Sequence, residues 1–180
     1  YDLRVPETRQ AQADMAREYG VEAFCYWHYW FGNGRRLLER PFNEVLESGK
    51  PDFPFCLAWA NHSWRGIYNG VKTKESLIDQ TYGGLSDYER HFYDVLPAFE
   101  DKRYVTVDGK PFFLIFAPAE IPDSREFIDC WQRLAARNGL TGIHFVAHTY
   151  QPNDIDNFLS MGYDAVNVVR LFEYQRIGIS

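Results

Sequence analysis

"PFFLIFAPAEIPDSREFIDCWQRLAARNGLTGIHFVAHTY", residues 111–150, holds two short apolar runs separated by a helix-like segment. Both runs have the length and the aromatic and β-branched content of buried strands. Between them, Asp123 and Glu126 have the spacing of a helix capping box, and Asn138-Gly139 is a typical helix stop. This order predicts two parallel strands joined by a crossover helix.

The same alternation extends in both directions from this unit. The first helix is expected to bury a face formed by Ala11, Met15, Ala16 and Tyr19. Asp108-Gly109 predicts a hairpin, and Ser86 with Glu89 predicts a second capping box. The expected helices cover residues 4–20, 38–48, 86–99, 122–139 and 153–161, and the expected strands lie in 21–30, 53–61, 104–118, 143–150 and 164–172.

Five strands that alternate with helices fit two α/β architectures, an open doubly wound sheet and a (β/α)8 TIM-barrel-like fold. A nucleotide-binding open sheet would need a glycine-rich phosphate loop, and the sequence contains none. Polar and aromatic residues instead follow several expected strands, where barrel enzymes place their sites. These residues are His28, Trp30, Asn61, Glu120, His148, Tyr150 and Arg170. We therefore expect an incomplete barrel of about five β/α units, forming a single domain over residues 1–180.

Composition narrows the class of protein. The chain of 180 residues carries a net charge of −6, with no Lys/Arg run longer than two, which argues against a nucleic-acid or anionic membrane surface. Cys25, Cys56 and Cys130 are widely spaced, so we expect reduced, buried thiols, no zinc site and a cytoplasmic location. No apolar run is long enough to cross a membrane.

"CLAWANHSWRGIYNG", residues 56–70, combines aromatic rings with hydrogen-bonding side chains in a loop after an expected strand. This mixture suits sugars, whose C–H faces stack on aromatic rings while their hydroxyls need donors and acceptors. Arg35 and Arg36 are candidates for holding a phosphate or carboxylate, although such a pair is more often a solvated surface feature. No spacing of His, Asp and Glu predicts a metal site, and no cofactor is expected.

Three stretches resemble the WbsX-type glycosyltransferase family, also described as glycoside hydrolase family 99-like. They are "YDLRVPETRQAQADMAREYGVEAFCYWHYWF", "RLLERPFNEVLESGKPDFPFCLAWAN" and "VDGKPFFLIFAPAEIPD", and the resemblance extends over most of residues 1–170. It implies a (β/α)8-type domain that acts on glycans, typically in bacterial polysaccharide or O-antigen assembly.

The sequence departs from the family pattern in two ways. Where the family usually continues Glu-Asn-Trp after the second strand, this chain has His62, Ser63 and Trp64. The family's first strand would precede Tyr1, and its Trp-Asn-Glu-Trp segment, which carries the principal catalytic carboxylates in the hydrolases, would follow Ser180. We therefore expect a fragment without the first and last barrel strands, whose catalytic residues are unknown. Glu120 and Asp123 fit a turn and a helix cap better than a catalytic pair.

Six residues are predicted to contact sugar: His28, Trp30, Asn61, Trp64, His148 and Tyr150. Strict alternation along a strand places His28 on one face with Trp30, and Trp27 with Tyr29 on the other. His148 and Tyr150 likewise share a face. If these faces point inward they converge above the barrel, and alternation alone leaves this phase open.

Three functions remain open at this stage. The first is transfer from a nucleotide- or lipid-linked sugar donor to a glycan, and the second is endo-acting hydrolysis of mannose-containing glycans. The third is a non-catalytic carbohydrate-binding or structural remnant, in which exposed sheet edges would need a partner. The sequence does not choose between transfer and hydrolysis.

Overall fold

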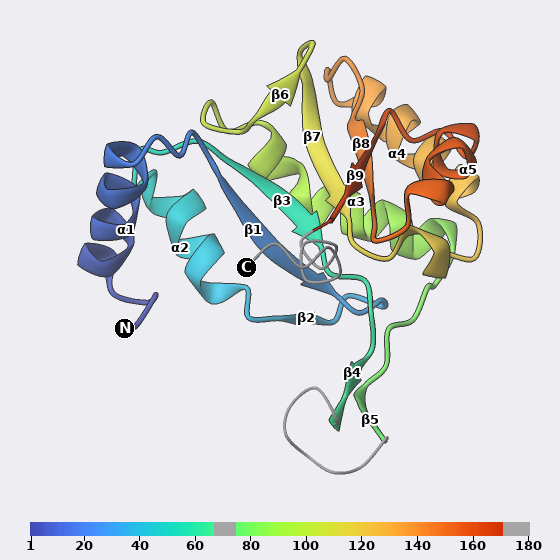
Figure 1. The fold of residues 1–180 in the computed structure, drawn as a ribbon, viewed down its shortest axis with the longest axis horizontal. Coiled ribbons are helices and arrows are strands. Elements are labelled where there is room, and N and C mark those ends of the chain that lie inside the picture. Colours follow the sequence, from blue (N-terminus) through green and yellow to red (C-terminus); the bar gives the residue numbers. More distant parts are fainter. Residues whose placement is uncertain (67–74, 171–180) are drawn as a thin grey trace, which may run out of the picture.

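The computed structural model of the chain describes residues 1–66 and 75–170. Its helices and strands follow the expected alternation (Figure 1). The helices are α1 Pro6–Glu18, α2 Arg40–Ser48, α3 Leu85–Phe99, α4 Ser124–Arg137 and α5 Ile155–Ser160, with 3-10 turns at Pro118–Glu120 and Pro152–Asp154. The strands are β1 Phe24–Trp30, β2 Arg36–Leu37, β3 Phe55–Trp59, β4 Trp64–Arg65, β5 Ser76–Ile78, β6 Thr106–Val107, β7 Lys110–Ile115, β8 His144–Thr149 and β9 Ala165–Val168.

The main sheet has the order β2-β1-β3-β7-β8-β9, with β6 paired to β7. Its five long strands, β1, β3, β7, β8 and β9, pair in parallel and in the order of the chain. A doubly wound sheet would reverse its strand order at a switch point, and no reversal occurs among these strands. The observed order is that of consecutive β/α barrel units, although the described strands do not close into a barrel.

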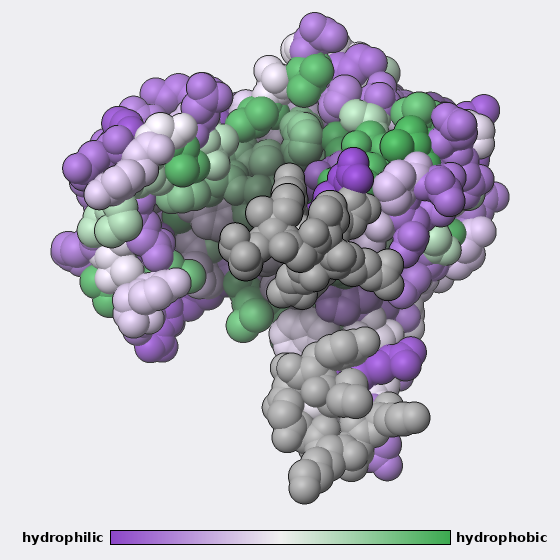
Figure 2. Space-filling view, viewed as in Figure 1, coloured by the Kyte–Doolittle hydropathy of each residue, from purple (hydrophilic) through white to green (hydrophobic). Residues whose placement is uncertain are grey.

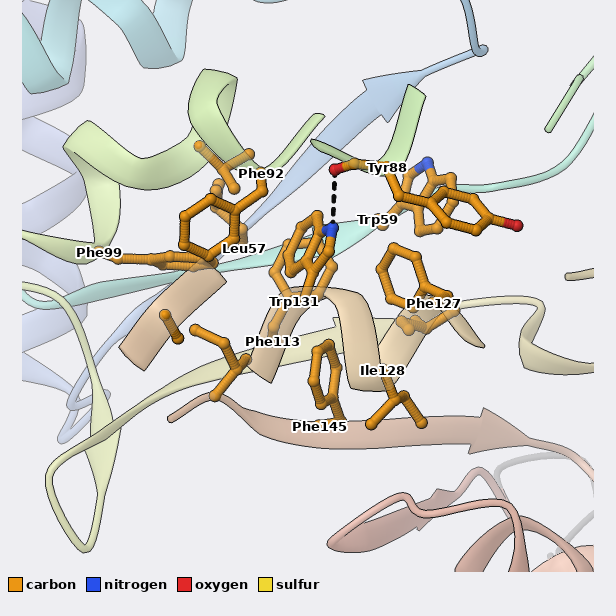
Figure 3. Packing of buried hydrophobic residues seen from close by; sticks show 14 of the residues in the cluster. Leu57, Trp59, Tyr88, Phe92, Phe99, Phe113, Phe127, Ile128, Trp131 and Phe145 are labelled. Carbon is orange, nitrogen blue, oxygen red and sulfur yellow. Dashed lines mark hydrogen bonds between the residues drawn. The ribbon is translucent and has the colours of Figure 1, made fainter. Parts of the chain in front are cut away.

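One face of the sheet is covered by α3 and α4, and this layer holds the main hydrophobic core (Figure 3). Trp131 of α4 lies near its centre, is fully buried, and donates its indole Nε1–H to the Tyr88 carbonyl at 3.0 Å. The strands contribute alternate residues to this core: Leu57, Trp59, Phe113, Ile115, Phe145 and Ala147. The period of two therefore determines which half of each strand meets the helices.

The opposite face of the sheet is less completely covered. Ala58, Leu114 and Val146, which alternate with the core residues, form only a small separate cluster. Seen from this side, the surface is hollowed over the strands, and hydrophobic residues line the hollow (Figure 2). The carboxyl ends of the parallel strands lie at the edge from which β4 and β5 extend (Figure 1).

Local signals in the sequence were confirmed at two turns. Asp108 and Gly109 both have positive φ, 50° and 77°, and join β6 to β7 as the two-residue hairpin turn that such pairs favour. Asp123 caps α4 by accepting the Glu126 backbone N–H at 2.8 Å. Both signals are local hydrogen-bonding or backbone preferences that need no tertiary context.

Two predictions about the helices were wrong. The capping box at Ser86 does not form, because α3 begins one residue earlier and has Gly84 as its N-cap. On α1 the buried side is formed by Arg9, Ala13 and Ala16, whereas Met15 and Tyr19 are exposed. Small alanines, rather than the larger apolar residues, let this helix approach Phe53, which lies beside the sheet.

Candidate functional site

The last four residues of β1, residues 27–30, place ring side chains on the two opposite faces of the sheet. Trp27 contacts the ring of Phe116 edge to face, with 5.5 Å between centroids, and Tyr29 contacts Trp64 in the same manner at 5.3 Å. Trp27 and Tyr29 therefore lie on the open face. His28 and Trp30, being the alternate residues, point toward α3.

His28 and Trp30 are both 4% exposed and packed beneath α3. The ring of His28 stacks on His91 of α3, and their Nε2 atoms lie 2.9 Å apart, so one nitrogen donates and the other accepts. Trp30 donates its indole Nε1–H to Asp87, also on α3. The phase that alternation left open is thus settled: this face of β1 meets α3 and does not point into the barrel. His28 and Trp30 can be buried on the helix-covered face because α3 supplies hydrogen-bond partners for their ring nitrogens.

Burial also fixes the charge state of the histidine pair. It lowers the pKa of His28 to about 3 and the pKa of His91 well below its ordinary value, and the guanidinium of Arg36 acts in the same direction. Both rings are therefore neutral at pH 7. Their shared hydrogen bond is consistent with this, since at least one of the two rings must be neutral to supply the acceptor nitrogen.

Asn61 follows β3 and is fully buried. Its amide Nδ2 donates to the carbonyl of Ala117 at 2.7 Å and to the Tyr82 hydroxyl at 3.0 Å, and its Oδ1 accepts the Ala117 N–H at 2.7 Å. These bonds use both of its N–H groups. Asn61 thus ties the end of β3 to the segment after β7, which shapes the adjoining cavity, and its predicted contact with sugar stays a prediction.

A cavity of about 890 Å³ opens at the carboxyl edge of the sheet, beside this link. It is built from the ends of β1, β3, β7 and β8 and from the loop that carries β4. Its lining residues are Tyr29, Leu38, His62, Ser63, Trp64, Arg65, Phe116, Ala117, Glu120 and Tyr150. Of the six predicted sugar contacts, Trp64 and Tyr150 line this cavity.

Trp64 is held against β1 by two edge-to-face contacts. Its ring lies 5.3 Å from Tyr29 and 5.5 Å from Phe31, with interplanar angles of 82° and 88°. These two contacts fix the orientation of the Trp64 ring, which stays half-buried beside the cavity. This geometry suits an aromatic wall for a ligand.

His62 and Glu120 are the titratable pair of the cavity. Burial lowers the pKa of His62, while the negative charge of Glu120 opposes that change. The His62 ring is therefore mainly neutral at pH 7 and has both a donor and an acceptor nitrogen. Its Nδ1 is buried without a hydrogen-bond partner among the described residues. Of the described residues that line the cavity, Glu120 alone carries a carboxylate.

His148, a predicted sugar contact, lies just behind this lining. Its ring stacks on Phe116 at 4.9 Å and meets the ring of Tyr150 edge to face at 5.0 Å. Its Nδ1 lies 3.1 Å from the Asn167 amide nitrogen. His148 thus supports the orientation of two lining rings, Phe116 and Tyr150, from the side.

Eight of the ten described lining residues were absent from the predicted sugar contacts, and four of these have aromatic or titratable side chains of most use to the site: Tyr29, His62, Phe116 and Glu120. His62 directly follows Asn61 and lay in the loop judged suitable for sugar, but it was singled out only as a departure from the family pattern. Glu120 had been assigned to a turn beside a helix cap, and the structure gives the cap to Asp123 and leaves Glu120 facing the cavity. Tyr29 was missed because alternation does not show which face of β1 meets the helices, and the sugar contacts were chosen from the face that carries His28 and Trp30.

Residues 1–66 and 75–170 contain no cluster of three or more His, Cys, Asp or Glu side chains able to hold a metal ion. No helix in this part of the chain is both long and apolar enough to cross a bilayer. Cys25, expected to be buried, is exposed on the open face opposite Cys56.

Comparison with known proteins places this geometry in context. The sequence model of a family described as Glycosyltransferase WbsX matches residues 1–176. The uncharacterized protein WxcX of Xanthomonas campestris pv. campestris is 32% identical over 167 residues, which are 92% of this chain and 23% of that protein. The chain thus spans about a quarter of the length of this curated relative.

Solved structures agree on the fold. The GH99 endo-alpha-mannosidase from Bacteroides thetaiotaomicron matches with a TM-score of 0.62 at 14% identity, over 93% of this chain and 44% of that one. A protein described as glycoside hydrolase-like matches with a TM-score of 0.65 at 14% identity, over 98% of this chain and 55% of that one. At this identity the likeness concerns the fold, and it covers about half of each structure.

Proposed function

The chain belongs to the WbsX glycosyltransferase family, and from this premise we propose that it is a glycan-binding part of a carbohydrate-active enzyme. In this proposal the protein transfers a sugar from a nucleotide- or lipid-linked donor during assembly of a bacterial surface polysaccharide such as O-antigen. The observation that carries the proposal is the cavity at the carboxyl edge of the parallel sheet, where aromatic rings and hydrogen-bonding groups converge.

Each part of this cavity has a use in binding sugar. Tyr29 and Trp64 present ring faces to the C–H side of a pyranose, and the Glu120 carboxylate accepts hydrogen bonds from two neighbouring hydroxyls. Neutral His62 adds both a donor and an acceptor. The cavity volume lies within the range of pockets that enclose small ligands.

Hydrolysis is the second candidate, and the fold shared with the GH99 endo-alpha-mannosidase favours it. Glycoside hydrolysis commonly uses two carboxyl groups on either side of the scissile bond. Glu120 is the one carboxylate among the described lining residues, so in either reaction we assign the described part of the cavity to binding and leave the catalytic residues unassigned.

Product analysis separates the two reactions. The full-length protein is incubated with α-mannose oligosaccharides, with and without a panel of sugar nucleotides and lipid-linked sugars, and products are followed by mass spectrometry. Elongation that requires the donor supports transfer, whereas shortening without any donor contradicts it and supports hydrolysis. Binding without either product would support the non-catalytic alternative.

A variant of Glu120, compared with a control variant, tests whether the glycan binds in this cavity. Glu120→Gln keeps the side-chain size and removes the charge, and we expect weaker glycan binding. Glu89→Gln, an exposed residue on α3, is the matched control and is expected to bind as the unmodified protein does. Equal binding by both variants would remove Glu120 from the site.

A further inference from the structure

Cys25 and Cys56 lie side by side on two neighbouring strands, and neither lines the cavity. β1 and β3 pair in parallel, and their register sets Cys25 directly opposite Cys56. Directly paired residues project from the same face of a sheet, and adjacent strands lie about 4.8 Å apart. This spacing falls within the Cα separations of about 4.4–6.8 Å that a disulfide spans. The backbone therefore holds two free thiols where a bond between them can form.

The two thiols contact each other and differ in acidity. The Cys56 thiol donates a hydrogen bond to the sulfur of Cys25, and this bond lowers the pKa of Cys25 against the opposing effect of burial. The same bond, together with burial, raises the pKa of Cys56. Because the thiolate is the nucleophile, Cys25 is the sulfur that reacts first, and Cys56 is placed to react with the product.

Cys130, the third cysteine, has neither of these properties. It lies on α4 within the main core, and burial raises its pKa. The sheet separates it from Cys25, which lies on the open face. Cys130 is thus a packing residue, whereas Cys25 and Cys56 form a dithiol pair.

We propose that Cys25 and Cys56 are a reversible redox site, in which hydrogen peroxide oxidises the two thiols to a disulfide that links β1 to β3. The Cys25 thiolate attacks one peroxide oxygen, the O–O bond breaks, and a sulfenic acid forms as hydroxide leaves and is protonated to water. Cys56, having lost its proton, then attacks the sulfenic sulfur, so that the S–S bond forms and the S–O bond breaks. The second hydroxide also becomes water. In total the two thiols lose two electrons and two protons, and the peroxide is reduced to two water molecules.

The oxidant is hardly larger than a water molecule, so this chemistry does not require the open face to be free for a large ligand. The new bond would close a loop over residues 25–56, which includes β2, α2 and the end of β1. Tyr29 and Leu38 of the cavity lining lie within this loop. Oxidation would therefore constrain one wall of the cavity from the amino ends of the strands. No step involves a glycan, so the inference is independent of the proposed function.

The experiment looks for the bond itself in the full-length protein. The reduced protein is treated with hydrogen peroxide, the remaining thiols are alkylated, and the digested protein is analysed by mass spectrometry. We expect a linked pair of peptides that contain Cys25 and Cys56, and its loss after treatment with dithiothreitol. Amide hydrogen exchange in β1 and β3 should be about tenfold slower in the linked protein.

Three variants separate the roles of the cysteines. Cys56→Ser removes the second thiol, so Cys25 should accumulate as a sulfenic acid that dimedone labels. Cys25→Ser removes the first thiol, so neither the link nor the label should appear. Cys130→Ala is the matched control, and its link between Cys25 and Cys56 should form as in the unmodified protein.

Four results would overturn the proposal. Labelling of Cys25 by dimedone in the unmodified protein without a link would show that Cys56 does not reach the sulfenic sulfur. Reaction at neither cysteine would show that the pair is closed to the peroxide. A link from Cys25 to a different cysteine would show that the pair is wrong. Unchanged amide exchange in the linked protein would show that the bond does not constrain β1 and β3.

Discussion

The two faces of β1 carry the same kind of residue and use it differently. On the face toward α3, His28 and Trp30 are buried and their polar atoms pair with His91 and Asp87. On the open face, Trp27 and Tyr29 pack against neighbouring rings and keep part of their surface free. The two faces differ in whether α3 supplies hydrogen-bond partners for the side chains. Aromatic content alone does not distinguish a stabilising residue from a ligand-binding one.

Polar atoms explain why the covered face tolerates histidine and tryptophan. A buried polar atom without a partner costs about 1–3 kcal/mol, and α3 removes most of that cost by supplying a hydrogen-bond partner to each ring. Asp87 is itself held by the backbone N–H of Asn33 at 2.8 Å and by Arg90 at 3.2 Å. The covered face is thus a hydrogen-bonded joint between β1 and α3, whereas the open face has unused ring surface.

The largest effect that would test this contrast is on folding stability. Trp30→Ala should lower the free energy of unfolding by about 3–5 kcal/mol, since it removes a buried ring and leaves Asp87 without its indole donor. Trp27→Ala should lower it by about 1 kcal/mol, because half of that ring is already in water. Urea denaturation followed by circular dichroism measures both. Equal losses would show that the two faces do not differ in the way described.

The next largest effect is expected from acidification, which should lower folding stability through the histidines of the covered face. The folded-state pKa of His28 is about 3, below the ordinary value near 6.5, so the unfolded chain takes up protons first as the pH falls. The stability that the neutral ring contributes is complete above pH 6.5 and is lost progressively toward pH 3. Between pH 7 and pH 5 the loss is about 2 kcal/mol for His28, and His91 adds to it in the same direction.

The pH effect is checked by urea denaturation at pH 7, 6 and 5. His28→Gln removes one titrating ring, so its stability should depend less on pH over this range. The variant itself will be less stable at pH 7, which is why slopes rather than absolute stabilities are compared. An unchanged slope would mean that His28 is not held neutral by the fold.

Much of the fold could be predicted from the sequence because its signals are local. The cap at Asp123 and the turn at Asp108-Gly109 depend on hydrogen bonds and backbone angles within a few residues. Alternation of strands and helices predicted the parallel sheet and, without a phosphate loop, the barrel order. The failed cap at Ser86 shows the limit, since a competing start one residue earlier was equally compatible with the sequence.

The site was harder to predict than the fold. Alternation showed that His28 shares a face with Trp30, but it did not show which face meets a helix, because that depends on contacts with α3 that lie about 60 residues away. Glu120 and Phe116 come into the cavity through the turn after β7, whose direction is set by the Asn61 link to Ala117. Such long-range placement has no signature in a short stretch of sequence.

The open face is tested most directly by its aromatic wall. Trp64→Ala should weaken glycan binding about tenfold, because it removes a ring that faces the cavity, while costing about 1 kcal/mol of stability since the ring is only half-buried. Calorimetric titration and urea denaturation of the same preparation measure the two effects. Trp64→Phe should retain most of the affinity. A large stability loss with unchanged binding would make Trp64 a packing residue like Trp30.

The smallest expected effect distinguishes the histidines of the two faces by their titration. In histidine NMR spectra, His28 and His91 should stay neutral throughout the range near their ordinary pKa, whereas His62 should titrate below that ordinary value. Glu120→Gln should lower the pKa of His62 further, since the carboxylate is what opposes the effect of burial there. The same variant should leave His28 unchanged, because Glu120 is not among the charges that act on it. A pKa of His62 that does not fall in Glu120→Gln would mean that the two side chains do not interact in the cavity, and the open face would then lack the carboxylate and neutral imidazole through which we expect it to hold sugar hydroxyls.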